Sequence, residues 1–251
     1  MADLLVRRIQ VCLNGGRPAA DHPGIPVTQA QLAVAAQDAV AAGADAVHLH
    51  PRGATGQESL AYADVAAAVS AVRSACPHTP IGVTTGLWIT DGDASARLGL
   101  IRSWLAGDPA GLPDYASVNL SEPGFDDLTG LLHEAGVAVE AGVWSIADAD
   151  RLARSRHAQE VLRILVEVID LPADTCEAEA DAILARLRAY ALRPPVLLHG
   201  ENASAWPLIS RAGRLGLATR IGFEDALTGP GGDPVRDNAD LVRAALALLS
   251  R

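Results

Sequence analysis

Short apolar runs rich in β-branched residues alternate with longer runs of helical period along the chain. The short runs predict strands, and the longer runs, in which apolar residues recur at helical spacing, predict a helix after each strand. The expected strands cover residues 8–15, 46–51, 80–86, 115–122, 137–144, 161–169, 195–201 and 218–225.

The first and last predicted helices carry recognisable end signals. In the first, Thr28 and Gln31 stand at capping-box spacing and Gly43 closes the helix. The last is expected to begin near "DPVRDNAD", with Asp233 as its cap and Pro234 in the first turn. The apolar stripe of the first helix consists of Leu32, Ala36, Ala39 and Val40.

Eight strands alternating with eight helices in 251 residues predict a single (β/α)8 TIM barrel spanning residues 1–251. A doubly wound open sheet is the structural alternative. No GxGxxG motif follows the first predicted strand, which disfavours a dinucleotide-binding version of that sheet.

The composition narrows the chemistry. The formal net charge is −10 with no dense basic patch, so we do not expect nucleic-acid binding. All 20 basic residues are arginine, and an arginine side chain cannot form a Schiff base. Lysine-dependent aldolases, pyridoxal-phosphate enzymes and P-loop ATPases are thereby excluded. A bond broken next to a carbonyl would need a metal ion or an oxyanion hole.

The three cysteines, Cys12, Cys76 and Cys176, are scattered without a CxxC motif, which favours a reducing, cytoplasmic location. No apolar run approaches the ~18 residues that cross a membrane. The first residues lack the apolar stretch of a secretory signal. We therefore expect no membrane association.

Two histidines end the second predicted strand, in "AVHLHP". Because side chains alternate along a strand, Val47 and Leu49 should face the helices while His48 and His50 point into the barrel. Catalytic residues of such barrels lie at the carboxyl ends of the strands. The pair predicts a divalent metal site; the alternative is two hydrogen-bonded polar residues lining a pocket.

The eighth predicted strand, "RIGFED", supplies the partner residues. Arg220, Gly222 and Glu224 share a face, and the eighth strand of a barrel lies beside the first, which adjoins the second. Two histidines with Glu224 leave coordination positions open, as in catalytic zinc sites, and the same set also suits ferrous iron. Asp225 is a candidate general base. Arg220 is a candidate for holding a substrate carboxylate or a neighbouring acid.

Other polar residues fall at or near strand ends. His199 and Glu201 form a second inward pair, either a rival metal site or an outer shell, and Glu140 and Glu167 are further wall residues without an assigned role. The candidate substrate-binding residues are Asn14, Thr84, Ser117 and Asn119, with Thr85 and Ser121 beside them.

These segments resemble one known family. "IPVTQAQLAVAAQDAVAAGADAVHLHPRGATG", "TTG", "ASVNLSE" and "RIGFEDA" are similar, in the same order, to the β-keto acid cleavage enzymes. The resemblance implies a zinc-dependent TIM barrel, usually a tetramer, that converts a β-keto acid and acetyl-CoA into acetoacetate and a new acyl-CoA. It implies that His48, His50 and Glu224 bind zinc and that Asp225, held by Arg220, is the acid/base.

The chain departs from the family where "HLHPRG" replaces the common HLHVRD, so that Gly53 stands in place of an aspartate. Two other hypotheses remain open from the sequence. One is a metal-dependent hydrolase or lyase on the same barrel acting without CoA. The other is a non-enzymatic binding barrel whose catalytic residues have been lost.

Overall fold

The computed structural model describes residues 4–169 and 171–250. Within them, eight parallel strands form one sheet in the order β7-β6-β5-β4-β3-β2-β1-β8. A parallel bridge between Leu197 and Ala218 joins the two outer strands and brings the ring to closure. The strands are β1 (Ile9–Cys12), β2 (Ala46–Leu49), β3 (Ile81–Val83), β4 (Tyr115–Asn119), β5 (Ala138–Val143), β6 (Arg163–Val168), β7 (Val196–Gly200) and β8 (Thr219–Ile221).

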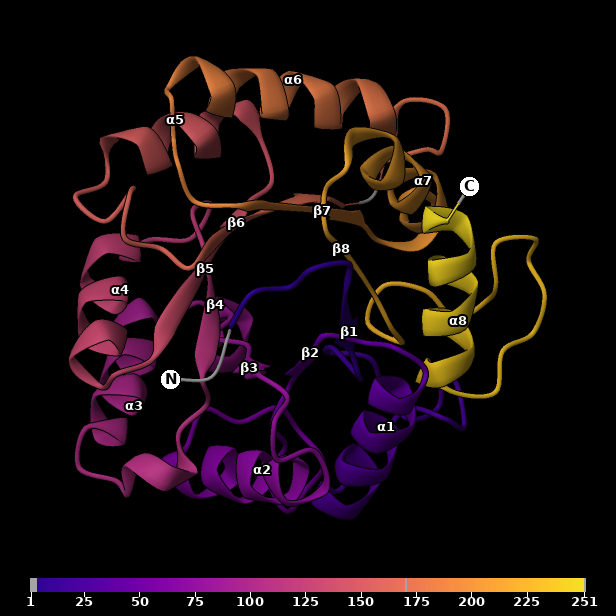
Figure 1. Ribbon diagram of the computed structural model, residues 1–251. Helices are drawn as coiled ribbons and strands as arrows, with labels where there is room; N and C mark the ends of the chain where they lie inside the picture. The colour runs from indigo at the N-terminus through magenta and orange to yellow at the C-terminus, as the bar shows by residue number, and fades with distance from the viewer. Residues whose placement is uncertain (1–3, 170, 251) are drawn as a thin grey trace.

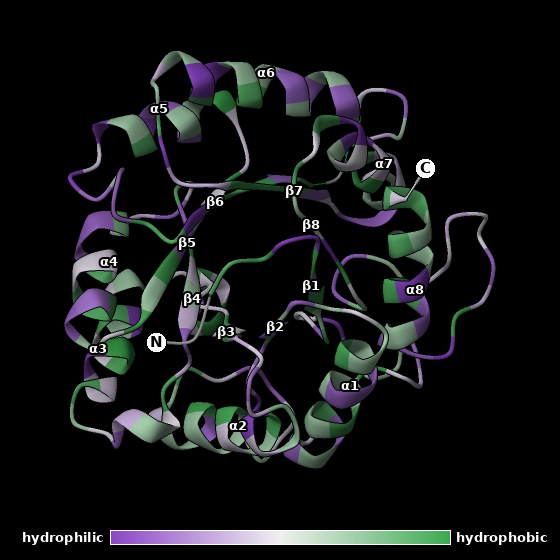
Figure 2. Ribbon diagram, in the orientation of Figure 1, coloured by the Kyte–Doolittle hydropathy of each residue, from purple (hydrophilic) through white to green (hydrophobic). Residues whose placement is uncertain are grey.

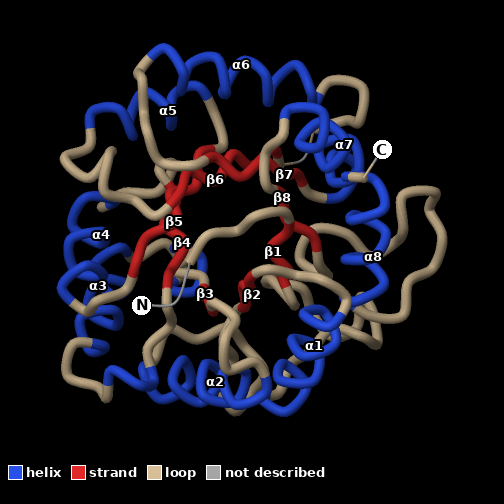
Figure 3. The backbone as a smooth tube through the Cα atoms, viewed as in Figure 1, coloured by secondary structure: helices blue, strands red, loops and turns tan. Residues whose placement is uncertain are grey.

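Helices surround this ring, as the view along the barrel axis shows (Figure 1). Strands form the inner circle and helices the outer one, which confirms the predicted (β/α)8 barrel and excludes the open sheet (Figure 3). The helices are α1 (Gln29–Ala41), α2 (Tyr62–Ala75), α3 (Ala94–Trp104), α4 (Phe125–Glu134), α5 (Ile146–Arg154), α6 (Cys176–Ala189), α7 (Ala205–Leu215) and α8 (Asn238–Leu249).

The ends of α1 and α8 differ in how well the sequence predicts them. At α1, Thr28 and Gln31 form the expected capping box. At α8, the cap is Asp237, whose side chain accepts a hydrogen bond from the Asp240 N–H, and the predicted start at Asp233 and Pro234 is wrong. Pro234 instead forms an antiparallel bridge with Thr228, so that segment belongs to a loop.

The strands are shorter than predicted at the end that carries the chemistry. β8 stops at Ile221, because the N–H groups of Asp225 and Ala226 both donate to the carbonyl of Gly222 in a turn. Glu224 therefore reaches the barrel mouth from a turn rather than from the strand.

The opposite end of the barrel is covered by the segment before β1, which crosses the opening of the strand ring in Figure 1. Val6 in this segment is buried and packs with Ala46, Leu165 and Leu197. Apolar residues line the strands and the inner faces of the helices, while hydrophilic residues alternate with them along helices such as α6 (Figure 2). Burying these faces against one another supplies the main driving force for folding.

A polar layer lies inside the ring. Glu140 on β5 and Arg163 on β6 are cross-strand neighbours, and Arg163 Nε lies 2.5 Å from Glu140 Oε1. Arg163 also donates to the carbonyl of Leu4 and lies over the ring of Tyr115. This layer occupies the covered end, which leaves the carboxyl ends of the strands as the open mouth.

Candidate metal centre and active site

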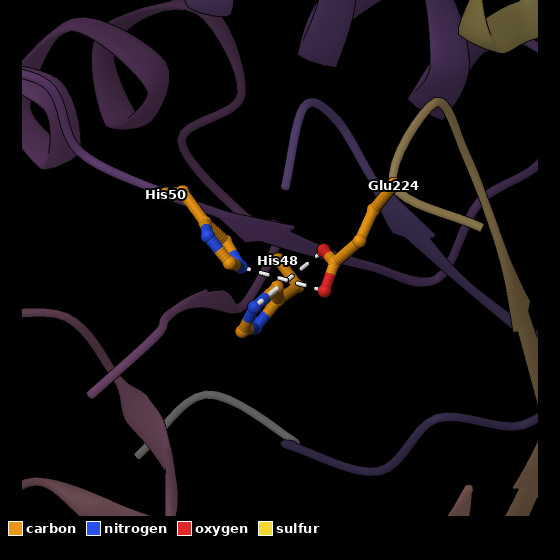
Figure 4. Close-up of side chains that lie close together, drawn as sticks. All are labelled: His48, His50 and Glu224. Atoms are coloured by element: carbon orange, nitrogen blue, oxygen red, sulfur yellow. Dashed lines mark ion pairs between the residues drawn. The ribbon is translucent and has the colours of Figure 1, made fainter. Parts of the chain in front are cut away.

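His48 and His50 both point into the barrel mouth, as the alternation along β2 predicts (Figure 4). His48 lies within the strand, whereas His50 follows its last residue. Beyond the end of β2, the side chain of Asn14 makes the hydrogen bonds to the backbone of His50 that a neighbouring strand would otherwise make. Its Oδ1 accepts the His50 N–H at 2.9 Å, and its Nδ2 donates to the His50 carbonyl at 3.0 Å. The backbone of His50 is thereby fixed beyond the end of the sheet.

Glu224 faces the two imidazoles from the turn after β8 (Figure 4). Its Oε2 lies 3.9 Å from Nε2 of His48, and its Oε1 lies 3.4 Å from Nε2 of His50. Ligand atoms of the three residues all lie within 4.8 Å of one another. The structure thus brings together His48 and Glu224, which lie 176 positions apart in the chain.

The donor set fits a divalent cation. Among the described residues, Glu224 Oε2 is buried without a hydrogen-bond partner, although it faces the histidines. Burial lowers the pKa of His48 to about 4, which keeps its imidazole neutral and able to bind metal. Burial also lowers the pKa of His50, but the carboxylates of Glu224 and Glu58 outweigh it and raise that pKa to about 9. The site therefore attracts positive charge, which a metal ion would supply.

A buried ionic cluster lies beside this triad. Arg220 Nη2 lies 2.9 Å from Asp225 Oδ1, 3.0 Å from Glu224 Oε1 and 3.3 Å from Glu167 Oε1. One guanidinium thus links three carboxylates, an arrangement that suits the planar fork of arginine. Burial lowers the pKa of Arg220, but Asp225 and the other carboxylates outweigh it and raise the pKa above its ordinary value.

His199 lies on the far side of the same cluster. Its Nδ1 is 3.5 Å from Asp225 Oδ1 and its Nε2 is 3.6 Å from Glu167 Oε1. Asp225 itself is fully buried, and its Oδ2 has no hydrogen-bond partner among the described residues. His199 therefore adjoins the acids of the site and lies outside the group of three metal-ligand candidates.

A cavity of about 460 Å³ opens at the barrel mouth above these residues. Its lining includes most of the candidate metal-ligand, catalytic and substrate-binding residues, but Asn14 and Asp225 are not part of it. The side chain of Asn14 hydrogen-bonds to the backbone of His50 instead, and Asp225 lies behind Arg220. The nominated residues on the cavity wall are His48, His50, Thr84, Ser117, Asn119, Arg220 and Glu224.

A polar wall of the cavity comes from β4 and from the loop after β3, the strand that pairs with β2. Asn119 Nδ2 donates to Glu122 Oε1, and Thr84 Oγ1 accepts the N–H of Gly86. The hydroxyl of Thr85 donates to the carbonyl of Ser117 and joins the two strand ends. Ser121, predicted to share this wall, is exposed and lies outside the cavity, because β4 ends at Asn119.

Comparison with known families agrees with this geometry. A family model described as "beta-keto acid cleavage enzyme" matches residues 8–251. The chain belongs to the beta-keto acid cleavage enzyme family. No curated protein matches the chain.

Solved structures share the barrel. ObcA in binary complex with oxaloacetate superposes with a TM-score of 0.73 at 20% identity, covering 90% of this chain and 63% of that one. ObcA in ternary complex with a C4-CoA adduct and oxalate superposes with a TM-score of 0.73 at 19% identity, covering 91% of this chain and 64% of that one. The 3-dehydroquinate dehydratase of Geobacillus kaustophilus HTA426 superposes with a TM-score of 0.63 at 14% identity, covering 97% of this chain and 91% of that one. This family member therefore spans less than two thirds of the length of ObcA, and these likenesses establish the fold.

Several residues that line the cavity could not be predicted from the sequence pattern of this family member. Trp144 lines the wall and donates through Nε1 to Glu167 Oε2 at 2.8 Å. Arg17 reaches from the loop after β1 to the carbonyl of Glu224 and the side chain of Asn202. Isolated tryptophans and loop arginines are too common for their spacing to predict these positions.

The residues without an assigned role fall into two groups. Glu167 and Glu201 line the cavity, whereas Glu140 is paired with Arg163 in the layer below. Glu201 follows β7, and burial together with Glu167 and other nearby carboxylates raises its pKa to about 9. Glu201 therefore adds a protonated carboxyl to the cavity wall at neutral pH.

A second group of possible metal ligands, His133, His157 and Glu160, lies on the outside of the barrel. Both ring nitrogens of His157 have partners, since Nδ1 lies 2.9 Å from Glu160 and Nε2 accepts from Arg156. The adjacent guanidinium would repel a cation.

Among the described residues, no helix is long and apolar enough to cross a bilayer.

Proposed function

We propose that this protein condenses a β-keto acid with acetyl-CoA and releases acetoacetate and a new acyl-CoA, with a zinc ion held by His48, His50 and Glu224. The observation that carries the proposal is the convergence of these three side chains, within 4.8 Å, in a chain of the beta-keto acid cleavage enzyme family. The complexes of ObcA with oxaloacetate and with a C4-CoA adduct support keto acid and CoA substrates.

Two imidazoles and one carboxylate favour zinc over harder cations, and ferrous iron is the second choice. When bound, the metal supplies Lewis-acid stabilisation of the negative charge that develops on the β-keto oxygen. Because the chain has no lysine, this polarisation cannot come from an iminium.

The proton transfer is assigned to Asp225. Its Oδ1 accepts hydrogen bonds from Nε and Nη2 of Arg220, at 3.2 and 2.9 Å, which leaves Oδ2 without a partner among the described residues. We propose that Asp225 takes a proton from C2 of the β-keto acid, and that the carbanion attacks the thioester carbonyl of acetyl-CoA and displaces the CoA thiolate. The thiolate then adds to the ketone at C3, and retro-Claisen cleavage of the C2–C3 bond releases the new acyl-CoA and the acetoacetate carbanion, which takes the proton back from Asp225.

Substrate orientation is assigned to the polar wall of the cavity. Thr84 places its hydroxyl beside the strand that carries His48, since β3 pairs with β2, and Ser117 and Asn119 on β4 add hydroxyl and amide groups further along the cavity wall. We propose that these groups orient the substrate carboxylate and tail. Asn14 acts indirectly, through the backbone of His50.

The test is a panel of β-keto acids incubated with acetyl-CoA and the purified, zinc-loaded protein. We expect acetoacetate and an acyl-CoA to form together, in equal amounts, from at least one acid. Zinc-dependent consumption of a β-keto acid without acetyl-CoA would instead support a hydrolase or lyase. A protein that binds zinc and forms no acetoacetate from any member of the panel would contradict the proposal.

We also propose a homo-oligomer, and a tetramer by family resemblance. Large apolar side chains are exposed on the outer surface, including Val34 on α1 and Tyr190 after α6. The molar mass in solution, measured by light scattering, distinguishes a tetramer from the 26.0 kDa monomer.

A further inference from the structure

Two residues outside the predicted site form an arm that ends on His50. Glu58, from the loop between β2 and α2, places Oε1 2.6 Å from Nδ1 of His50. The indole Nε1 of Trp88 lies 3.2 and 3.0 Å from the two carboxylate oxygens of Glu58 and donates to them. The Trp88 ring also stacks beside the His50 imidazole, with ring centroids 6.2 Å apart and planes inclined by 24°.

The arm acts on one histidine of the pair. A carboxylate that accepts the Nδ1 proton leaves the lone pair on Nε2, and Nε2 of His50 is the atom that faces Glu224. By contrast, Nδ1 of His48 is buried without a hydrogen-bond partner among the described residues. His50 is therefore the ligand whose ring orientation and tautomer are set from outside the triad.

Glu58 is held in place by the backbone of its own loop. Arg52 and Glu58 form an antiparallel bridge, and the N–H of Ser59 donates to the carbonyl of Pro51 at 2.9 Å. The guanidinium of Arg52 donates to the carbonyls of Gly15 and Arg17 and ties this loop to the one that follows β1. The side chain of Glu58 consequently approaches His50 from a braced hairpin.

The carboxylate does not come from position 53. Gly53 has no side chain, and a Cβ built there would lie 3.3 Å from Oδ2 of Asp64 on α2. Asp64 accepts the hydroxyl of Ser59, and no hydrogen bond or ion pair joins it to His50 among the described residues. In this chain, the acidic partner of the metal-ligand histidine is therefore Glu58.

We propose that Glu58 is a positioning residue for the metal centre, held by Trp88, and that it fixes the His50 imidazole with Nε2 directed at the ion. The inference rests on the proposed metal site and deepens it. Outer-shell carboxylates of this kind typically raise metal affinity by about 10- to 100-fold.

The experiment measures zinc affinity by competition with a chromophoric chelator for the wild type and four variants. We expect Glu58→Ala to weaken binding by about 10- to 100-fold. Glu58→Gln should weaken it less, because its amide oxygen still accepts from Nδ1, and Trp88→Phe should fall between Glu58→Gln and the wild type. Asp64→Asn, which removes a nearby charge without touching His50, should bind zinc as the wild type does.

A spectroscopic readout separates positioning from loop stability. In the zinc-loaded wild type, the proton on Nδ1 of His50 should be observable by nitrogen-edited NMR because Glu58 holds it, and Glu58→Ala should lose that signal. Equal zinc affinities of Glu58→Ala and Asp64→Asn would overturn the positioning role and leave the metal site intact. A wild type that binds no zinc would overturn both the positioning role and the metal site.

Discussion

The backbone of Gly15 lies directly against the side chain of Glu224. A Cβ built on Gly15 would stand 2.6 Å from Cγ and 2.9 Å from Cβ of Glu224, and Gly15 has a φ of +55°. Glycine is thus required here twice, for the left-handed backbone and for the space. The loop after β1 therefore sets the position of the carboxylate that completes the triad.

Gly15→Ala should consequently weaken zinc binding as well as folding. We expect the left-handed conformation to cost about 1–2 kcal/mol of unfolding free energy. The displaced Glu224 should lower zinc affinity at least as strongly as the loss of Glu58. Urea unfolding of the metal-free protein and chelator competition measure the two effects separately.

Gly216→Ala is the matched control for this prediction. Gly216 ends α7 with a φ of +66°, and a Cβ there would meet nothing within 4 Å. It should lose a similar amount of stability and keep the wild-type zinc affinity. If both variants bind zinc as the wild type does, the contact between Gly15 and Glu224 does not constrain the carboxylate.

The placement of the two proposed metal ligands on β2 could be predicted because it depends on local geometry. A two-residue side-chain period places His48 and His50 on one face of a strand, and barrel topology brings the end of β8 close to β2. The same reasoning overextended β8 through Glu224. The residue does reach the site, but a turn that the alternation cannot predict delivers it.

Side chains that arrive from loops could not be predicted in this way. Glu58 and Arg17 owe their positions to loop conformations, and Trp88 to a short 3-10 helix, Leu87–Thr90, after β3. Long-range contacts set the loop conformations, such as the hydrogen bonds of Arg52 to Gly15 and Arg17. Asn14 illustrates the opposite case. It lies two residues beyond β1, near the barrel mouth, but its amide hydrogen-bonds to the backbone of His50.

His48→Ala and His199→Ala should separate the metal site from its acidic surroundings. His48→Ala removes a ligand and should leave the dialysed protein without stoichiometric zinc. His199→Ala should retain zinc, since its ring lies between Asp225 and Glu167 and outside the triad. Metal analysis of both proteins is the measurement, and the reverse pattern would move the metal to His199 and Glu201.

Asp225→Asn should abolish turnover without releasing zinc. The amide keeps an oxygen for Arg220 but cannot accept the proton from C2 of the β-keto acid, so we expect kcat to fall by about 10²- to 10⁴-fold. Glu201→Gln is the comparison, because Glu201 lines the cavity whereas Asp225 lies behind its wall. If Glu201→Gln loses turnover and Asp225→Asn does not, Asp225 is not the base.

The buried pair of Glu140 and Arg163 should make stability depend on pH. Burial alone would raise the pKa of Glu140, but Arg163 outweighs it and lowers the pKa below 4.5. A depressed carboxyl pKa stabilises the fold fully above the unfolded value, and the contribution disappears as the pH falls through the folded value. Glu140→Gln leaves Arg163 charged and unpaired in the interior, which should cost about 3–5 kcal/mol at pH 7.

The measurement is urea unfolding of the metal-free wild type and of Glu140→Gln, from pH 7 down to acidic pH. The difference between their unfolding free energies should be largest at neutral pH and shrink below about pH 4.5, where Glu140 of the unfolded wild type takes up its proton. Adding Arg163→Met to Glu140→Gln should recover part of the loss, because it removes the unpaired charge. A difference in unfolding free energy that stays constant with pH would mean that the ion pair does not stabilise the covered end of the barrel.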